Sequence, residues 1–204
     1  MNIVGIDEAG RGPLAGPVVA AAVLLSLGGK LPRNCFKFND SKKLSAEERE
    51  ELYSVVCEHS IARGIGIVSP QEIDEINILQ ATMKAMTLAV KQLEESLHDQ
   101  MPQVLLVDGN YFRTTLSYPF KTIIDGDALS PSIAAASILA KTTRDKIMHK
   151  MHDEYPQYNF RQNKGYGTKE HREAIAQYGL SDQHRKSFKL KENILLELEF
   201  EEYK

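Results

Sequence analysis

The segment that most constrains the fold is a glycine- and proline-rich stretch, residues 8–17, which lies between two apolar runs. The first run, residues 3–7, reads Ile-Val-Gly-Ile-Asp, and the second, residues 18–25, is eight consecutive apolar residues that begin with two valines. Their lengths and β-branched residues favour buried strands. Three glycines and two prolines between them predict a loop with unusual backbone angles. The chain is therefore expected to begin with two strands joined by an irregular loop.

Helix and strand signals alternate along the rest of the chain. Ser45 with Glu48 forms a capping box, and Ser69-Pro70 supplies an N-cap followed by proline at the first helical position. This order predicts an α/β domain with a helical C-terminal part. We expect a single domain over residues 1–204, with a helical substrate-binding extension over about 150–204. The patterns predict further strands at 61–68, 104–107 and 120–124, and helices at about 45–59, 69–97, 130–155, 168–178 and 191–203.

Acidic residues follow three of the predicted strands. Asp7 and Glu8 end the first strand, and Asp108 and Asp127 follow two later ones. A single acid of this kind is commonly a cap or turn former, and Asp108 followed by glycine would suit a hairpin turn. However, ligands of α/β sheets bind where strand ends meet, and clustered carboxylates attract hard divalent cations. The four acids are therefore candidate ligands for Mg²⁺ or Mn²⁺, and two such ions would suit phosphodiester cleavage.

The glycine-rich loop allows two interpretations. Gly10 to Gly16 resembles a relaxed dinucleotide-binding fingerprint, but that motif requires a helix directly after it. Pro17 and an apolar run follow here, which argues against a nucleotide-dependent enzyme. The second interpretation is a nucleic-acid contact, in which backbone N–H groups of Gly10 to Gly12 bind a phosphate or sugar oxygen. Arg11 would add a bidentate phosphate donor.

The charge is unevenly distributed along the chain. The formal net charge of −3 argues against a nucleic-acid partner, yet residues 141–191 carry twelve Lys and Arg against six Asp and Glu. Aromatic residues are interleaved with the basic ones in this stretch, which is typical of a nucleic-acid groove with stacking surfaces. The alternative is a solvated helical face. Lys42 and Lys43 form a second, smaller basic site. The aromatic residues are Tyr155, Tyr158, Phe160, Tyr166 and Tyr178.

Composition excludes several other classes of protein. With 42% hydrophobic and 26% charged residues, the chain is neither disordered nor collagen-like. Its two cysteines, Cys35 and Cys57, form no metal-binding motif and are expected to be reduced thiols. The N-terminus lacks signal-peptide features, and the longest apolar run is too short to cross a bilayer. We therefore expect a cytoplasmic protein without membrane contact.

Several sequence blocks, in order, resemble those of type 2 ribonucleases H, specifically bacterial ribonuclease HII. The resemblance runs from about residue 3 to residue 190, and its first block is highly specific. The blocks are Gly5 to Val18, Asp40-Ser41-Lys42-Lys43-Leu44, Val107 to Asn110, Gly126-Asp127, Ile133 to Lys141, Arg144-Asp145, Lys164 to His171, and His184-Arg185 with Ser187-Phe188.

This resemblance implies a ribonuclease H-like fold, with a five-stranded mixed sheet flanked by helices. It implies an endonuclease that hydrolyses the RNA strand of RNA–DNA hybrids and cuts 5′ of single ribonucleotides in duplex DNA, as in ribonucleotide excision repair. Two-metal-ion catalysis with Mn²⁺ or Mg²⁺ would leave 5′-phosphate and 3′-hydroxyl ends. The enzyme is expected to be a monomer, and a contact with a replication clamp is an open possibility.

The resemblance also assigns roles to residues. The acids that match the family's metal ligands are Asp7, Glu8, Asp108 and Asp127. Gly10, Arg11 and Gly12 match the sensor of the ribonucleotide 2′-hydroxyl, and Tyr166 matches the tyrosine that stacks on the neighbouring deoxyribose. Lys42 and Lys43 are candidate substrate-binding residues.

Two features bear on these assignments. Asp125 stands where the family often has lysine. As a neighbouring acid it also competes with Asp127 for a ligand role, but Asp127 occupies the position that matches the family's Gly-Asp pair. Arg11 favours ribonuclease HII over the related ribonuclease HIII. A non-catalytic nucleic-acid-binding module with structural acids is the remaining alternative.

Overall fold

The computed structural model describes residues 2–26, 46–97 and 101–188. A five-stranded mixed sheet forms its centre, in the order β3-β2-β1-β4-β5. Strands β1 (Ile3–Ala9), β2 (Val18–Leu25) and β3 (Ser60–Val68) pair antiparallel, whereas β4 (Val104–Asp108) and β5 (Phe120–Ile123) run parallel to β1. The predicted ribonuclease H-like sheet is therefore confirmed. None of the described helices is long and apolar enough to cross a membrane.

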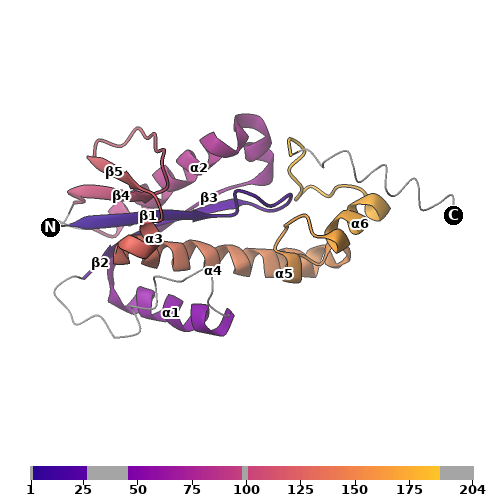
Figure 1. Ribbon diagram of the computed structural model, residues 1–204, viewed down its shortest axis with the longest axis horizontal. Helices are drawn as coiled ribbons and strands as arrows, with labels where there is room; N and C mark the ends of the chain where they lie inside the picture. The colour runs from indigo at the N-terminus through magenta and orange to yellow at the C-terminus, as the bar shows by residue number, and fades with distance from the viewer. Residues whose placement is uncertain (1, 27–45, 98–100, 189–204) are drawn as a thin grey trace.

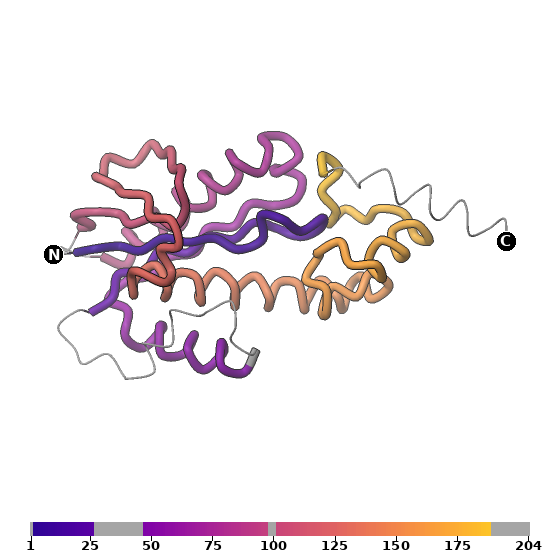
Figure 2. The backbone as a smooth tube through the Cα atoms, viewed as in Figure 1, coloured from indigo at the N-terminus to yellow at the C-terminus, as the bar shows by residue number. Residues whose placement is uncertain are grey.

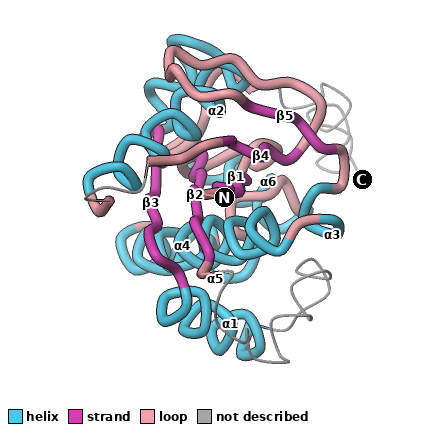
Figure 3. The backbone as a smooth tube through the Cα atoms, turned by 90° about the vertical axis from the view of Figure 1, so that its left-hand side faces the viewer, coloured by secondary structure: helices cyan, strands magenta, loops and turns pink. Residues whose placement is uncertain are grey.

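Helices cover both faces of the sheet (Figure 3). Helix α2 (Pro70–Glu95) packs on one face, and α4 (Pro131–Glu154) with α1 (Ala46–His59) covers the other. All eight residues of β2 are buried, which explains why its sequence is uniformly apolar rather than alternating. The predicted N-cap of α2 is confirmed, since the Ser69 hydroxyl accepts a hydrogen bond from the backbone N–H of Glu72 at 3.2 Å.

Helix α4 lies very close to β1 because small residues face each other there. A β-carbon at Gly5 would lie 2.1 Å from the carbonyl carbon of Ser132, so only glycine fits at this position in the strand. The helix supplies Ala134, Ala135 and Ala136, all fully buried. This close approach aligns α4 with the strand that carries Asp7, and Figure 2 shows the helix running along the whole β1–β2 hairpin.

The C-terminal part packs around the far end of α4. It contains a 3₁₀ turn, η2 (Pro156–Tyr158), and helices α5 (Phe160–Asn163) and α6 (Lys169–Tyr178). Together with Met148 and Met151 of α4 they form a separate apolar cluster. In Figure 1 this region lies at the tip of the loop between β1 and β2. The helix predicted over 191–203, Lys42, Lys43, Cys35 and the Ser45 cap lie outside the described residues.

Candidate active site

Two adjacent parallel strands bring Asp7 and Asp108 to one edge of the sheet. Ile6 on β1 is in register with Val107 on β4, so the next residue of each strand is an aspartate. Asp7 of β1 and Asp108 of β4 thus lie at one sheet edge, as expected for these two strands. Asp7 lies within β1, because that strand continues to Ala9.

Asp7 is the most strongly perturbed acid of this edge. Its side chain is only 6% exposed, and its Oδ1 accepts a hydrogen bond from the Glu8 N–H at 2.7 Å. Burial, followed by repulsion from Glu8 and Asp108, raises the pKa of Asp7 well above its usual value, and a hydrogen bond from Ser137 on α4 opposes this effect. The protein thus holds a carboxylate that a nearby cation would stabilise.

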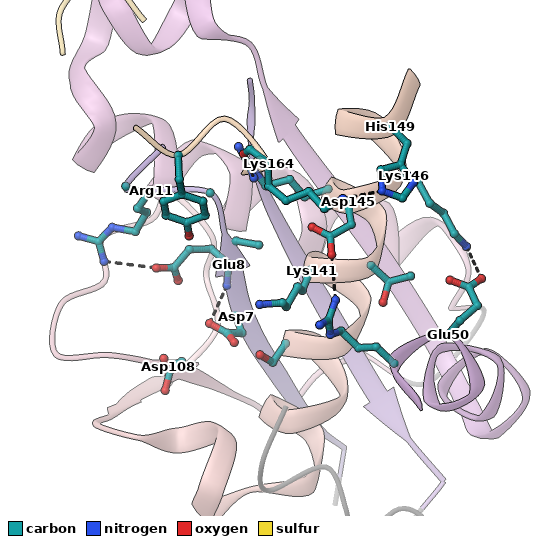
Figure 4. Close-up of a pocket in the computed structure, with 18 residues that line it drawn as sticks. Asp7, Glu8, Arg11, Glu50, Asp108, Lys141, Asp145, Lys146, His149 and Lys164 are labelled. Atoms are coloured by element: carbon teal, nitrogen blue, oxygen red, sulfur yellow. Dashed lines mark hydrogen bonds and ion pairs between the residues drawn. The ribbon is translucent and has the colours of Figure 1, made fainter. Parts of the chain in front are cut away.

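Glu8 links the acidic edge to the glycine-rich loop. Its Oε1 lies 3.3 Å from Nη1 of Arg11, whose side chain is about half exposed. Burial raises the pKa of Glu8, and the Arg11 charge opposes that rise. Figure 4 shows Asp7, Glu8 and Asp108 on the same side of the cavity.

Asp127 is positioned differently from the sequence-based expectation. It lies in a short helix, α3 (Gly126–Leu129), rather than directly at the end of β5. Asp108 anchors this turn, because its Oδ1 accepts a hydrogen bond from the Gly126 N–H at 2.7 Å. Asp127 is buried, whereas Asp125, which precedes the helix in the left-handed region with φ 52°, is exposed.

The oxygen atoms of Asp7, Glu8 and Asp108 are of the kind that binds a hard divalent cation. In this structure they accept hydrogen bonds from groups of the protein. Within residues 2–26, 46–97 and 101–188, no three Asp, Glu, His or Cys side chains converge as a ready ligand set. The Asp7, Glu8 and Asp108 oxygens instead accept hydrogen bonds from the Glu8 N–H, Arg11 and the Gly126 N–H. Burial, and then repulsion from Glu8 and Asp108, raises the pKa of Asp7, and both effects favour a bound cation such as Mg²⁺ or Mn²⁺.

The glycine-rich loop has the unusual backbone predicted for it. Gly10 adopts φ +95° and Gly16 φ +84°, and a β-carbon at Gly10 would lie 2.1 Å from Nε of Arg144. Strand β2, not a helix, follows the loop. Because a dinucleotide-binding motif requires a helix directly after its glycines, the dinucleotide-binding interpretation is wrong.

A cavity of about 820 Å³ joins the acidic edge to this loop. Its acidic end contains Asp7, Glu8 and Asp108, and Gly10, Arg11, Gly12 and Tyr166 border it. Tyr166 is 52% exposed, and a β-carbon at Gly12 would lie 3.6 Å from its ring. The cations along the rest of the cavity are Arg49, Lys141, Arg144, Lys146 and Lys164.

The predicted groove of basic and aromatic residues is only partly correct. The cations Lys141, Lys146 and Lys164 do line the cavity. Tyr158 and Phe160, however, are buried in the C-terminal cluster, since they pack around α4 rather than facing a ligand. Of the five aromatic residues singled out, Tyr166 alone lines this cavity.

Three residues of this region were given no role by sequence reasoning. Ser137 lines the cavity and hydrogen-bonds to Asp7, while Arg144 and Arg185 donate to carbonyl groups of the glycine-rich loop. Their only sequence signal was membership in the resembling blocks, because the contacts span more than 120 residues.

Comparison with known proteins identifies the family. A family model described as "Ribonuclease HII" matches residues 4–191. The ribonuclease HII of Syntrophus aciditrophicus is 54% identical over 189 residues, which cover 93% of this chain and 84% of that protein.

Solved structures agree with the fold. Ribonuclease H2 from Pyrococcus horikoshii OT3 superposes with a TM-score of 0.76 at 25% identity, covering 98% of this chain and 99% of that one. The ribonuclease HII in a PCNA complex from Archaeoglobus fulgidus gives 0.75 at 25% identity, covering 94% and 97%. A Bst-RNase HIII with Mn²⁺ gives 0.75 at 14% identity, covering 100% and 71%, and shows the fold alone.

These matches reject the alternative of a non-catalytic binding module. Asp7, Glu8 and Asp108 line one cavity, and all three lie within the residues that the family model matches. The chain belongs to the ribonuclease HII family and is an endoribonuclease that acts on the RNA of RNA–DNA hybrids.

Proposed function

We propose that this endonuclease also cuts duplex DNA 5′ of a single embedded ribonucleotide, leaving 5′-phosphate and 3′-hydroxyl ends. The observation that carries this proposal is that one cavity contains both the acidic edge and the loop of Gly10, Arg11 and Gly12. A site that reads one sugar and cleaves the adjacent phosphate needs both features within a nucleotide's length.

Asp7, Glu8, Asp108 and Asp127 would hold two divalent ions, Mg²⁺ or Mn²⁺, at the acidic edge. Bound there, the ions would activate water and stabilise the leaving oxygen. The protein's part is to hold Asp7 buried in β1 and Asp108 at the end of β4, where repulsion between them favours cation binding.

The glycine-rich loop would recognise the ribonucleotide. The 2′-hydroxyl is what distinguishes RNA from DNA at one nucleotide, and backbone groups of Gly10 to Gly12 line the cavity where it would lie. The half-exposed Tyr166 ring, beside Gly12, would pack on the next deoxyribose. Arg11 would contact a phosphate.

The basic end of the cavity would hold the duplex backbone. Lys141, Lys146 and Lys164 line it, and phosphate contacts of this kind supply most sequence-independent affinity. Lys42, Lys43 and the C-terminal part of the chain from about residue 150 are proposed to contribute further contacts. We further propose a cytoplasmic monomer that acts in ribonucleotide excision repair and can contact a replication clamp.

A single cleavage assay tests the function. A duplex with one ribonucleotide, an all-DNA duplex and a long RNA–DNA hybrid are each incubated with Mg²⁺ or Mn²⁺. We expect cuts in the hybrid and one cut 5′ of the single ribonucleotide, with the all-DNA duplex intact. Cleavage of the hybrid alone would overturn the single-ribonucleotide proposal.

A further inference from the structure

The guanidinium of Arg185 lies beneath the glycine-rich loop and is only 2% exposed. It donates three hydrogen bonds to loop carbonyl groups: from Nη2 to Gly10 at 2.6 Å, from Nη1 to Arg11 at 3.1 Å and from Nε to Gly16 at 2.9 Å. The Arg185 backbone N–H also donates to the Leu14 carbonyl at 2.8 Å. One side chain, distant in sequence, thus ties together both ends of the loop.

A charged side chain is a costly way to fill this space. Burial, and then the charge of Arg144, lowers the pKa of Arg185 to about 9. The nearby carboxylate of Asp74 accepts hydrogen bonds from the backbone N–H groups of Lys186 and Ser187. An apolar residue at this position would leave the carbonyl groups of Gly10, Arg11 and Gly16 without this donor, so the arginine serves these hydrogen bonds rather than the filling of space.

The three bonds determine which way two peptide groups face. In a planar trans peptide the N–H points opposite to the C=O. Because Arg185 binds the carbonyl groups of Gly10 and Arg11, the N–H groups of Arg11 and Gly12 must point away from Arg185. Gly10, Arg11 and Gly12 line the cavity, so these two N–H groups are directed to its side of the loop.

Arg144 binds a different part of the same loop. Its guanidinium donates to the carbonyl groups of Pro17, Ala15 and Lys164 at 3.0, 3.1 and 2.9 Å. It therefore holds the end of the loop, where the chain enters β2, and the segment just before Tyr166. The peptides at Gly10 and Arg11 are held by Arg185.

We propose that Arg185 is a positioning residue for ribonucleotide selectivity, which holds the N–H groups of Arg11 and Gly12 toward the sugar that carries the 2′-hydroxyl. This inference rests on the proposed function and deepens it, since it assigns the selectivity to a residue that does not touch the substrate. A lysine at this position would keep the charge but not the planar fork that reaches three carbonyl groups.

Binding without cleavage provides the test. In a D7N background without added divalent ion, affinity is measured for an all-DNA duplex and for the same duplex with one ribonucleotide. We expect the D7N protein to prefer the ribonucleotide. Adding R185K or R185Q should lower that preference about 5- to 10-fold, as for one lost hydrogen bond. In R185K the all-DNA affinity should change less than about twofold, because the charge remains.

A matched variant separates positioning from general destabilisation. Val90 is fully buried in the core that α2 forms with the sheet, so V90A should lower the melting temperature while leaving the hydrogen bonds of Arg185 in place, and it should keep the full preference. No preference in the D7N parent would overturn the proposed single-ribonucleotide function. A preference in that parent that survives in folded R185K and R185Q, or failure of both variants to fold, would assign Arg185 a structural role and overturn this inference.

Discussion

Nε2 of His171 lies 3.1 Å from Nε2 of His184, and both imidazoles are buried. Nδ1 of His184 accepts a hydrogen bond from the Ser181 N–H at 2.9 Å, so its proton is on Nε2 and is donated to His171. His171 Nδ1 can then donate to the Tyr166 carbonyl at 2.9 Å. Two neutral imidazoles therefore connect the segment that carries Arg185 to the one that carries Tyr166.

This pair should make stability depend on pH. Burial and the neighbouring His171 lower the pKa of His184 to about 4, against about 6.5 when unfolded. The unfolded chain then binds more protons between these values, so the free energy of unfolding should fall as the pH drops from about 6.5 to 4. The raised pKa values of Asp7 and Glu8 act in the opposite sense.

The contribution of His184 is isolated by comparing wild type with H184N in denaturant unfolding at several pH values. Asparagine can still accept from the Ser181 N–H but does not titrate. The stability difference between the two proteins should shrink by about 1–2 kcal/mol from pH 7 to pH 4.5. An unchanged difference would contradict the neutral pair.

Replacing the buried acids should abolish cleavage. We expect D7N and D127N to lose more than about 100-fold in hybrid cleavage, since even partners behind metal ligands cost 10–100-fold. The exposed D125N should cut at nearly the wild-type rate. Initial rates on a labelled hybrid, with circular dichroism to verify folding, check this. Loss of activity in D125N but not in D127N would reverse the assignment of the two acids.

The substitution D7N should also stabilise the protein when no metal ion is bound. The raised pKa of Asp7 means that its charged form is unfavourable in the folded chain at neutral pH. D7N should therefore have a higher free energy of unfolding than wild type in the presence of chelator. Adding Mn²⁺ should raise the melting temperature of the wild type, and it should raise that of D7N much less. A destabilised D7N, with D125N unchanged, would contradict the view that burial and the neighbouring acids disfavour the charged form of Asp7.

Tyr166 should matter most for single ribonucleotides. Y166A should lower their cleavage about 10-fold or more, because a stacking contact is worth about 1–3 kcal/mol. Y166F keeps the ring and should remain close to wild type. The measurement is kcat/KM on the single-ribonucleotide duplex. Equal values for Y166A and Y166F would exclude ring packing.

Duplex binding should weaken steeply with salt. Four phosphate contacts, from Arg11, Lys141, Lys146 and Lys164, would give a logarithmic slope of about −3.6, and so about 100-fold weaker binding between 50 and 200 mM salt. K141Q should reduce the slope by about 0.9. The exposed Lys91 on α2 supplies the control K91Q, which should leave it unchanged. A flat response in wild type would contradict a basic groove.

Local sequence patterns were sufficient for the first strands, the α2 cap and the strand-end acids. Residues 4–6 and 18–25 carry no polar side chains because they are buried, and Ser69 caps α2 through a hydrogen bond three residues away. Asp7 and Asp108 could be anticipated because parallel strands end at the same sheet edge. These features depend on runs of buried residues and on contacts between residues that are close in the sequence.

Tertiary structure decided what depends on distant contacts. Asp127 lies on a helix whose turn is anchored by Asp108, and Tyr158 belongs to the core because η2 folds back on α4. Arg185 reaches Gly10 across 175 residues of chain. No local propensity encodes such pairs, since their energy comes from burial and hydrogen bonds that exist only after the sheet, α4 and the C-terminal segment have packed together.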